Sequence, residues 1–100
     1  MSEKAYKFWR IKRWTEVWTQ LPQEERDRIF GEMQKNLEDV GGKWILRCTC
    51  SWANEEYRTW GVNEYPSLEA AVKDGQNLRK MDWARYVESE SMLGLPFEEG

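Results

Sequence analysis

One bounded amphipathic segment constrains the fold more than any other feature of the sequence. Pro22 suits the first turn of a helix, because the N–H that proline lacks has no helical partner there, and the acidic residues Glu24 and Glu25 follow it. Gly41 and Gly42 then supply a left-handed stop. The apolar residues between these ends recur at helical spacing: Ile29, Phe30, Met33, Leu37 and Val40. The pattern predicts a helix from about residue 22 to residue 40 with one packed face.

Three segments have the alternation and composition of β-strands. The first covers residues 4–13, with Tyr6, Phe8, Arg10 and Lys12 on one side and Lys7, Trp9, Ile11 and Arg13 on the other. The second, residues 43–52, directly follows the two glycines. The third, residues 57–65, comes after the short segment ANEE. The last two are predicted to pair as a hairpin.

A second helix and a fourth strand complete the predicted elements. Pro66 and Ser67 open the helix, with Ser67 as its N-cap, and the helix should end near Met81. Its predicted apolar face consists of Leu68, Ala71, Val72, Gly75 and Leu78. Residues 83–89 (WARYVES) are predicted as the last strand, and residues 93–100 as a tail.

The order of the elements predicts the fold class. Strand, helix, strand, strand, helix and strand make the split βαβ arrangement, an α+β ferredoxin-like fold whose four-stranded antiparallel sheet carries two helices on one face. A chain of 100 residues supports one core. We therefore expect a single domain over residues 1–100, with its core from about 4 to 92.

Aromatic side chains are too numerous for one face of such a sheet. The chain has 14, and alternation places Phe8 and Trp9 on opposite sides of the first strand and Trp60 and Tyr65 on opposite sides of the third. Two helices cover only one face, so the other would leave aromatic area in water unless a second subunit covers it. We therefore expect a homodimer formed through the sheet face.

The absence of histidine removes several classes of chemistry. Ser-His-Asp and Cys-His mechanisms, imidazole ligation of haem and the usual zinc sites all need that side chain. Cys48 and Cys50 have no further cysteine or histidine with which to bind a metal, and they lack the two-residue spacer of the usual redox pair. We interpret them as free thiols that line the core or a cavity wall, and we expect neither a metal nor a cofactor.

Charge and hydropathy limit the partners. Basic residues gather near the start of the chain and acidic residues near its end, while the net charge is −3, so we do not expect nucleic acid as a partner. No apolar run approaches the roughly 20 residues that a membrane span needs, and no signal-peptide pattern is present. These features predict a soluble, cytoplasmic protein that does not enter a membrane.

Two segments resemble a known group of proteins. Together with the βαββαβ order, YRTWGVNEYPSLEAAV (residues 57–72) and WARYVESESMLG (residues 83–94) resemble the dimeric α/β-barrel superfamily of ferredoxin-like proteins. Antibiotic-biosynthesis monooxygenases, muconolactone isomerases, stress-responsive barrel proteins and several families of unknown function belong to it. The resemblance implies a cavity between the sheet and the helices of each subunit, where the cofactor-free monooxygenases oxidise phenolic or enolic substrates.

Polar and aromatic residues of the predicted strands, and of the connection before the first helix, are candidates for ligand contacts. A cation or amide can stabilise a substrate anion, and aromatic residues can close one end of a cavity. The candidate ligand-binding residues are Arg10, Trp14, Trp18, Trp60, Asn63, Tyr65 and Arg85. The alternative for the arginines is pairing with surface carboxylates, and that for Trp14 and Trp18 is capping of the core.

Two functions stay open from the sequence. The first is a small-molecule-binding dimeric α/β-barrel protein, in its sharpest form a cofactor-independent monooxygenase or related small enzyme that acts on an aromatic or enolic substrate. It requires an enclosed apolar cavity. The second is a non-catalytic assembly or accessory protein whose aromatic residues serve subunit contacts.

Overall fold

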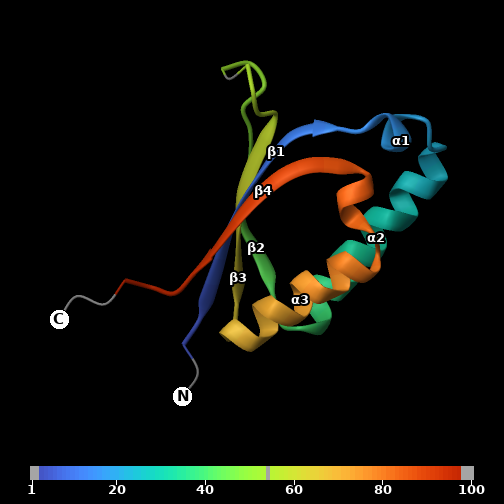
Figure 1. Ribbon diagram of the computed structural model, residues 1–100. Coiled ribbons are helices and arrows are strands. Elements are labelled where there is room, and N and C mark those ends of the chain that lie inside the picture. Colours follow the sequence, from blue (N-terminus) through green and yellow to red (C-terminus); the bar gives the residue numbers. More distant parts are fainter. Residues whose placement is uncertain (1–2, 54, 98–100) are drawn as a thin grey trace.

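A computed structural model describes residues 3–53 and 55–97 as two layers, a sheet and a set of helices that covers one of its faces (Figure 1). The elements are β1 (Ala5–Trp14), α1 (Glu16–Thr19), α2 (Gln23–Asp39), β2 (Lys43–Thr49), β3 (Thr59–Tyr65), α3 (Leu68–Lys80), the 3₁₀ turn η1 (Trp83–Arg85) and β4 (Val87–Gly94). The four strands are antiparallel to their neighbours, in the order β2-β3-β1-β4. The predicted βαββαβ arrangement is confirmed. Asn54 of the predicted turn and residues 98–100 of the predicted tail lie outside the described residues.

The end of α2 follows the prediction from the two glycines. Gly41 has a φ of 77° and donates its N–H to the carbonyl of Glu38, while Gly42 donates to the carbonyl of Leu37, both at 2.9 Å. This pair of bonds is the Schellman motif. A β-carbon at Gly42 would lie 2.5 Å from the Leu37 side chain and 3.0 Å from the Tyr65 ring. The chain therefore passes closely between α2 and β3 as it enters β2.

The buried face of α3 is rotated from the predicted one. Ser67 caps the helix through its side chain, as predicted. Ala71 and Asp74 are the buried residues, however, whereas Leu68 and Val72 are 44% and 47% exposed. The reason is that an acidic side chain occupies the centre of the stripe that faces the sheet, so the apolar spacing alone indicated a neighbouring stripe.

A β-bulge changes the alternation of β1. Ile11 pairs with Ser89 but Arg13 pairs with Glu88, so Lys12 is an extra residue in β1 relative to β4. Strict alternation placed Ile11 and Arg13 on the same side, and this is wrong. Ile11 is buried, whereas Arg13 is exposed and forms an ion pair with Glu88.

A second bulge, at Ile45, divides β2. The residues on either side of it, Trp44 and Leu46, pair with consecutive residues of β3. Trp44 packs against the core below the helices, whereas Leu46 lies on the other face and is exposed. Trp44 and Leu46, two residues apart, therefore do not share one apolar face of the strand. Trp52 also lies beyond the end of the strand and is 84% exposed.

The two cysteines are free thiols, as predicted. Cys48 pairs with Trp60 of β3, and Cys50 lies beside Trp60 and Tyr57 on the face of the sheet that has no helices. The two cysteines therefore do not line the core, which lies between the sheet and the helices. The bulge at Ile45 is the cause, because it shifts the alternation of β2 by one residue.

The last strand begins later than predicted. Asp82 adopts a left-handed conformation (φ 58°), and the next three residues form η1 instead of a strand. Thr15 fastens this turn to the start of α1: its N–H donates to the carbonyl of Tyr86 at 3.0 Å, and its hydroxyl donates to the carbonyl of Arg85 at 2.7 Å. Arg85 is thus a turn residue. No helix of the described chain is long and apolar enough to cross a membrane.

Candidate functional site

The helices divide the sheet into an inner face, which they cover, and an outer face. Cross-strand partners share a face, so the register assigns both sets of residues. The inner face carries the pairs Ala5–Tyr65, Lys7–Asn63, Trp9–Gly61 and Ile11–Thr59. The outer face carries the pairs Tyr6–Glu64, Phe8–Val62, Arg10–Trp60, Phe8–Met92 and Arg10–Glu90.

One end of the inner layer, where β1 begins and β3 ends, is an apolar core. It consists of Ala5, Leu37, Tyr65 and Ala71, all nearly or fully buried, with Trp44 packed against them. The small side chains of Ala5 and Ala71 leave room for the Tyr65 ring, which is the largest fully buried side chain. This end holds α2 and α3 on the sheet.

The other end is an aromatic cluster built around Trp14 and Trp18. Their rings stack with centroids 4.8 Å apart, and Phe30, Trp83 and Tyr86 meet them edge to face. Trp14 reaches the inner side because the bulge has shifted the alternation of β1. The cluster joins β1, α1, α2 and η1, and it closes this end of the layer.

A chain of hydrogen bonds occupies the middle of the inner layer. Trp9 Nε1 donates to Asn63 Oδ1 at 3.0 Å, and Asn63 Nδ2 donates to the Tyr65 hydroxyl at 3.3 Å. Tyr65 in turn donates to Asp74 Oδ2 of α3 at 2.6 Å. All three donors point the same way along the chain, which ends on a carboxylate. We call Lys7, Trp9, Asn63, Tyr65 and Asp74 the polar centre.

The alternation of large and small partners positions this chain. Gly61 lies opposite Trp9, and a β-carbon there would come within 2.4 Å of the indole and 2.6 Å of the Leu46 carbonyl. Only glycine lets the indole lie across β3 and reach Asn63, the next inner residue of that strand. Ala5 gives similar room to Tyr65, two inner pairs further along the two strands.

Asp74 has an unused acceptor. The residue is 3% exposed, and its Oδ1 is buried with no hydrogen-bond partner in the described part of the chain. Buried polar atoms are nearly always paired, so an orphan of this kind calls for an explanation such as a bound molecule. Arg26 Nε on α2 is the second such atom.

Lys7 places a cation beside this carboxylate. Burial lowers the pKa of its ammonium, because removal from water disfavours the charged form, and the charge of Asp74 opposes that change. Lys7 forms no ion pair with any residue that the structure describes. The charges of Lys7 and Asp74 thus act on each other without a direct contact among the described residues.

The Tyr65 hydroxyl is a fixed donor and not an acid. Burial raises its pKa well above the ordinary value, and the hydrogen bond to Asp74 adds to this effect. The hydroxyl therefore stays protonated at physiological pH. Its role in the polar centre is to hold Asp74 Oδ2, which leaves Oδ1 for another group.

The outer face holds a different set of the predicted residues. Arg10 pairs with Glu90 at 2.6 Å and lies over the Tyr57 ring, 4.1 Å from its centroid. Phe8, Cys50 and Trp60 join Arg10 and Tyr57 around an open hollow of about 210 Å³. The hydrogen bond from Arg10 lowers the pKa of Glu90, since the guanidinium stabilises the carboxylate.

The structure therefore divides the seven candidate residues among three places. Asn63 and Tyr65 lie in the polar centre, and Trp14 and Trp18 lie in the aromatic cluster beside it. Arg10 and Trp60 lie on the outer face, and Arg85 is exposed in η1. Only the first four share the inner layer.

Three residues of the polar centre escaped the sequence reasoning: Lys7, Trp9 and Asp74. A signal existed for Lys7 and for Asp74, but not for Trp9. Lys7 alternates with Ala5, Trp9 and Ile11, so it is a charge on an otherwise apolar strand face. Asp74 lies three residues after Ala71 and four before Leu78, so it is a charge on an apolar helix face.

The described residues offer no ready metal site. Nowhere in residues 3–53 and 55–97 do three or more histidine, cysteine, aspartate or glutamate side chains gather closely enough to hold an ion.

Comparison with known proteins identifies the fold. The chain matches no protein-family model, and no curated protein matches its sequence. A protein of unknown function from Rhodopseudomonas palustris superposes with a TM-score of 0.66 at 17% identity, over 99% of this chain and 86% of that one. The chain has a ferredoxin-like fold.

Two further structures share this ferredoxin-like fold. The hydroxynitrile lyase from Passiflora edulis gives a TM-score of 0.63 at 11% identity, over 100% of this chain and 99% of the lyase. A hypothetical Arabidopsis thaliana protein gives 0.58 at 6% identity, over 100% and 93%. At such identities the likeness is one of fold, which supports many unrelated activities. The predicted fold class and the resemblance to ferredoxin-like proteins are thus confirmed, and the chemistry has to be argued from the side chains.

Proposed function

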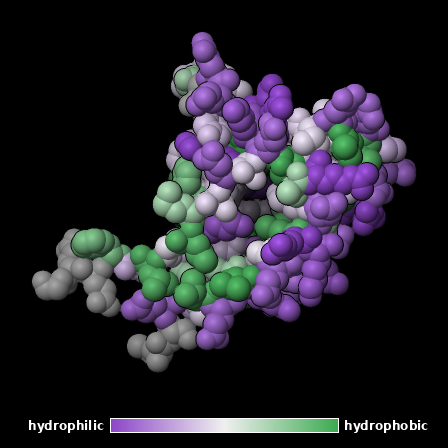
Figure 2. Space-filling model, viewed as in Figure 1, coloured by the Kyte–Doolittle hydropathy of each residue, from purple (hydrophilic) through white to green (hydrophobic). Residues whose placement is uncertain are grey.

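We propose that the polar centre binds a small aromatic or enolic molecule and acts on its hydroxyl group without a cofactor. The observation that carries this proposal is the buried Oδ1 of Asp74 together with the amine of Lys7, whose pKa Asp74 influences; neither group has a partner among the described residues. A ligand hydroxyl that donates to Oδ1 supplies the missing partner. The space-filling view supports access, since it shows a hollow between the sheet and the helices (Figure 2).

The chemistry follows from the two charges. Asp74 Oδ1 accepts the proton of a phenol or enol, and the Lys7 ammonium stabilises the oxygen anion that forms. Tyr65 keeps the carboxylate oriented through Oδ2, and Asn63 keeps the Tyr65 hydroxyl oriented. Proton removal of this kind is the first step of both cofactor-independent oxygenation and enol isomerisation.

The aromatic cluster suits an apolar ligand body. Trp14 and Trp18 lie at the end of the layer next to the polar centre, and Trp9 lies between them and Asn63 on the inner face. Aromatic side chains with a few convergent polar groups are the usual lining of small-molecule sites. The arrangement favours a ring with one polar edge over a highly charged ligand.

Binding tests the proposal directly. Small molecules retained after gentle purification are identified by mass spectrometry, and phenol and acetylacetone are titrated against the tryptophan fluorescence. Asp74→Asn should weaken binding of the ligand at least tenfold, about 1.4 kcal/mol. Glu69→Gln, an exposed acidic residue of the same helix, is the matched control and should bind as the wild type does. Equal binding by Asp74→Asn and Glu69→Gln would reject the site.

The reaction type is tested separately from binding. An oxygen electrode detects consumption of O₂ by an oxygenase, and exchange of substrate hydrogen with heavy water detects enolisation alone. Loss of either signal in Asp74→Asn, with retention in the control variant, supports catalysis at Oδ1. Binding without either signal leaves a ligand-binding protein without this chemistry.

The outer face supports a second function, in which aromatic and apolar residues form subunit contacts. No helix of the described residues covers it, and it exposes Phe8 and Met92, the latter by 71%. Arg10 and Glu90 already neutralise each other, so the face presents an apolar centre with paired charges. Such a surface suits a second copy of the chain, and we propose the homodimer through it.

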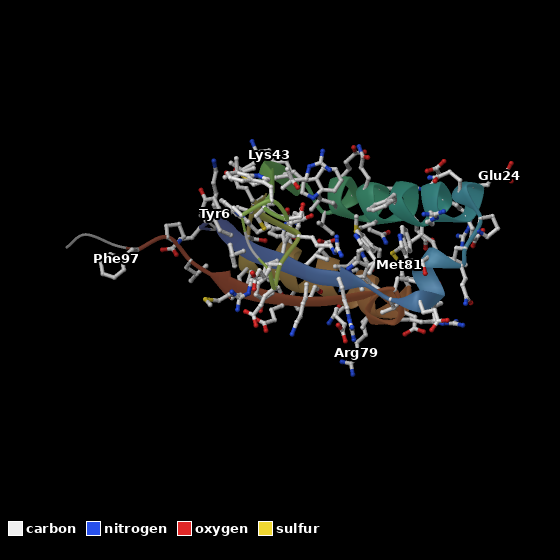
Figure 3. The ribbon with its side chains drawn as sticks, turned by 90° about the horizontal axis from the view of Figure 1, so that it is seen from above. Tyr6, Glu24, Lys43, Arg79, Met81 and Phe97 are labelled. Carbon is white, nitrogen blue, oxygen red and sulfur yellow. The ribbon has the colours of Figure 1, made fainter. Side chains whose placement is uncertain are left out.

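The C-terminal segment extends this apolar surface. Leu95 and Phe97 are exposed, and Phe97 lies beyond Tyr6 at the end of the molecule opposite Glu24 (Figure 3). Hydrophobic side chains gather over this end of the sheet, whereas the outward surface of the helices is hydrophilic (Figure 2). Sedimentation equilibrium tests the dimer. The protein concentration is varied from about 1 to about 100 µM, a range around a typical Kd. A single-chain mass throughout would reject it.

A further inference from the structure

Lys7 differs from every other lysine of the chain. The other six lysines, at positions 4, 12, 35, 43, 73 and 80, are all exposed, whereas Lys7 is partly buried on the inner face. Its cross-strand partner is Asn63, and Trp9 is the next inner residue of its own strand. The amine therefore projects from the middle of a rigid sheet into the layer between sheet and helices.

The groups around Lys7 are those that a reactive amine needs. Asp74 of α3 carries the charge that interacts with the Lys7 ammonium. The Tyr65 hydroxyl of β3 stays protonated and connects β3 to α3 through its hydrogen bond to Asp74. Burial raises the fraction of neutral amine at a given pH, because it lowers the pKa of Lys7. A desolvated lysine is the usual nucleophile toward carbonyl compounds.

We propose that Lys7 is the attachment point for an aldehyde or ketone that carries a neighbouring hydroxyl group. This inference rests on the proposed function, since it assigns the carbonyl class of ligand to the same polar centre. The hydroxyl donates to Asp74 Oδ1, and the adjacent carbonyl carbon then lies beside Lys7 Nζ. The unpaired carboxylate oxygen thus selects hydroxy-carbonyl ligands over simple carbonyls.

The step balances with the groups present. The Lys7 ammonium gives a proton to Asp74, and the neutral amine attacks the carbonyl carbon, so that a C–N bond forms and the C=O π bond breaks. One proton of the attacking amine then moves to the carbonyl oxygen, which becomes a hydroxyl. Asp74 returns the proton to that hydroxyl, which leaves as water. The products are a protonated imine on Lys7, a carboxylate on Asp74 and one water molecule, and no oxidant or reductant is used.

Reductive trapping tests the assignment. The protein is incubated at pH 7 with 2-hydroxybenzaldehyde and sodium cyanoborohydride, and the modified lysines are mapped by peptide mass spectrometry. An exposed lysine with a pKa near 10.4 is only about 0.04% neutral at this pH. We expect Lys7 to be labelled at least tenfold faster than any exposed lysine, and its labelling rate to level off at a lower pH than theirs.

The controls separate this inference from the proposed function. Lys43→Arg removes an exposed lysine and should leave labelling at Lys7 unchanged, whereas Lys7→Met should abolish the fast phase. Benzaldehyde, which has no hydroxyl, should label Lys7 more slowly than 2-hydroxybenzaldehyde does. If Lys7 of the wild type is labelled no faster than exposed lysines, the inference is overturned even if Lys7→Met fails to fold.

A non-reactive probe shows which proposal has failed. 2-Hydroxybenzyl alcohol has the hydroxyl but no carbonyl, and its binding is followed by tryptophan fluorescence. If it binds in an Asp74-dependent manner while the aldehyde does not label Lys7, only the carbonyl assignment is wrong. If neither compound engages the polar centre, the proposed function is rejected with it.

Discussion

Replacing Tyr65 by phenylalanine tests the physical basis of the polar centre. The substitution removes one oxygen atom and leaves the buried ring, so the packing against Ala5 and Leu37 is retained. That oxygen donates to Asp74 at 2.6 Å and accepts from Asn63 at 3.3 Å. Without it, Asp74 has no hydrogen-bond partner on either oxygen among the described residues, and the Asn63 amide loses its acceptor.

The structure gives the size of the effect. A hydrogen bond to a charged group contributes about 1.5–3 kcal/mol, and a neutral one about 0.5–1.5 kcal/mol. The bond to Asp74 is short and charge-assisted, whereas the bond from Asn63 is long. We therefore expect Tyr65→Phe to lower the free energy of unfolding by about 3 kcal/mol, which is a large part of the roughly 5–15 kcal/mol typical of a domain. For a chain of this length, that corresponds to a fall in Tm of about 12–24 °C.

Urea unfolding at pH 7, followed by tryptophan fluorescence and circular dichroism, measures the change. Tyr6→Phe is the matched control, because Tyr6 lies on the outer face and its hydroxyl has no partner among the described residues, so its variant should change by less than about 0.5 kcal/mol. A double-mutant cycle with Asp74→Ala should give a coupling of about 2 kcal/mol. A loss below about 1 kcal/mol, or no coupling, would refute the reasoning.

Three further changes test other features. Gly61→Ala would place a β-carbon 2.6 Å from the Leu46 carbonyl and 2.4 Å from the Trp9 ring, so the free energy of unfolding should fall by about 1–3 kcal/mol in urea titrations, and an unchanged midpoint would contradict the close packing. Lys7→Met should raise the free energy of unfolding at pH 7 by about 1 kcal/mol. Because burial lowers the folded-state pKa of Lys7, the unfolded chain binds more protons up to pH 10.5, so wild-type stability rises with pH and the gain should shrink between pH 7 and 10; a constant gain argues against burial of the amine. Met92→Glu on the outer face should weaken dimerisation at least tenfold in sedimentation equilibrium, and an unaltered dimer would place the interface elsewhere.

The sequence predicts well what local rules determine. The helix from residue 22 to 40 was found because Pro22 and Gly41 mark its ends, and the structure places α2 at Gln23–Asp39. The order of strands and helices followed from the same kind of boundary residues. Ser67 likewise predicted the start of α3 because an N-cap acts within one turn.

Features that depend on packing between distant segments were missed. Lys12 and Ile45 are extra residues in their strands, and nothing in their own identities distinguishes a bulge from regular alternation. Each shifts every later residue of its strand to the opposite face. The predicted faces of residues 4–13 were therefore right before the bulge at Lys12 and wrong after it.

The candidate site was predicted in part for a related reason. Asn63 and Tyr65 were selected as polar residues of a strand, whereas Trp9 carries no distinguishing pattern and Asp74 stands out only as a charge on an apolar helix face. A search for apolar periodicity ignores a charged residue on a buried stripe. Where that stripe contributes to a site, the charge is the informative residue, and Lys7 is the second example.

At position 12, β1 tolerates a change of side chain but not the removal of the residue. Lys12 is exposed, so exchanging its side chain costs little, but its backbone acts as a spacer that reverses the phase of the strand. Deleting it would restore unbroken alternation and rotate Trp14 toward solvent, which would separate it from Trp18. The backbone of this one residue thus allows both Ile11 and Trp14 to face the helices and close the interior.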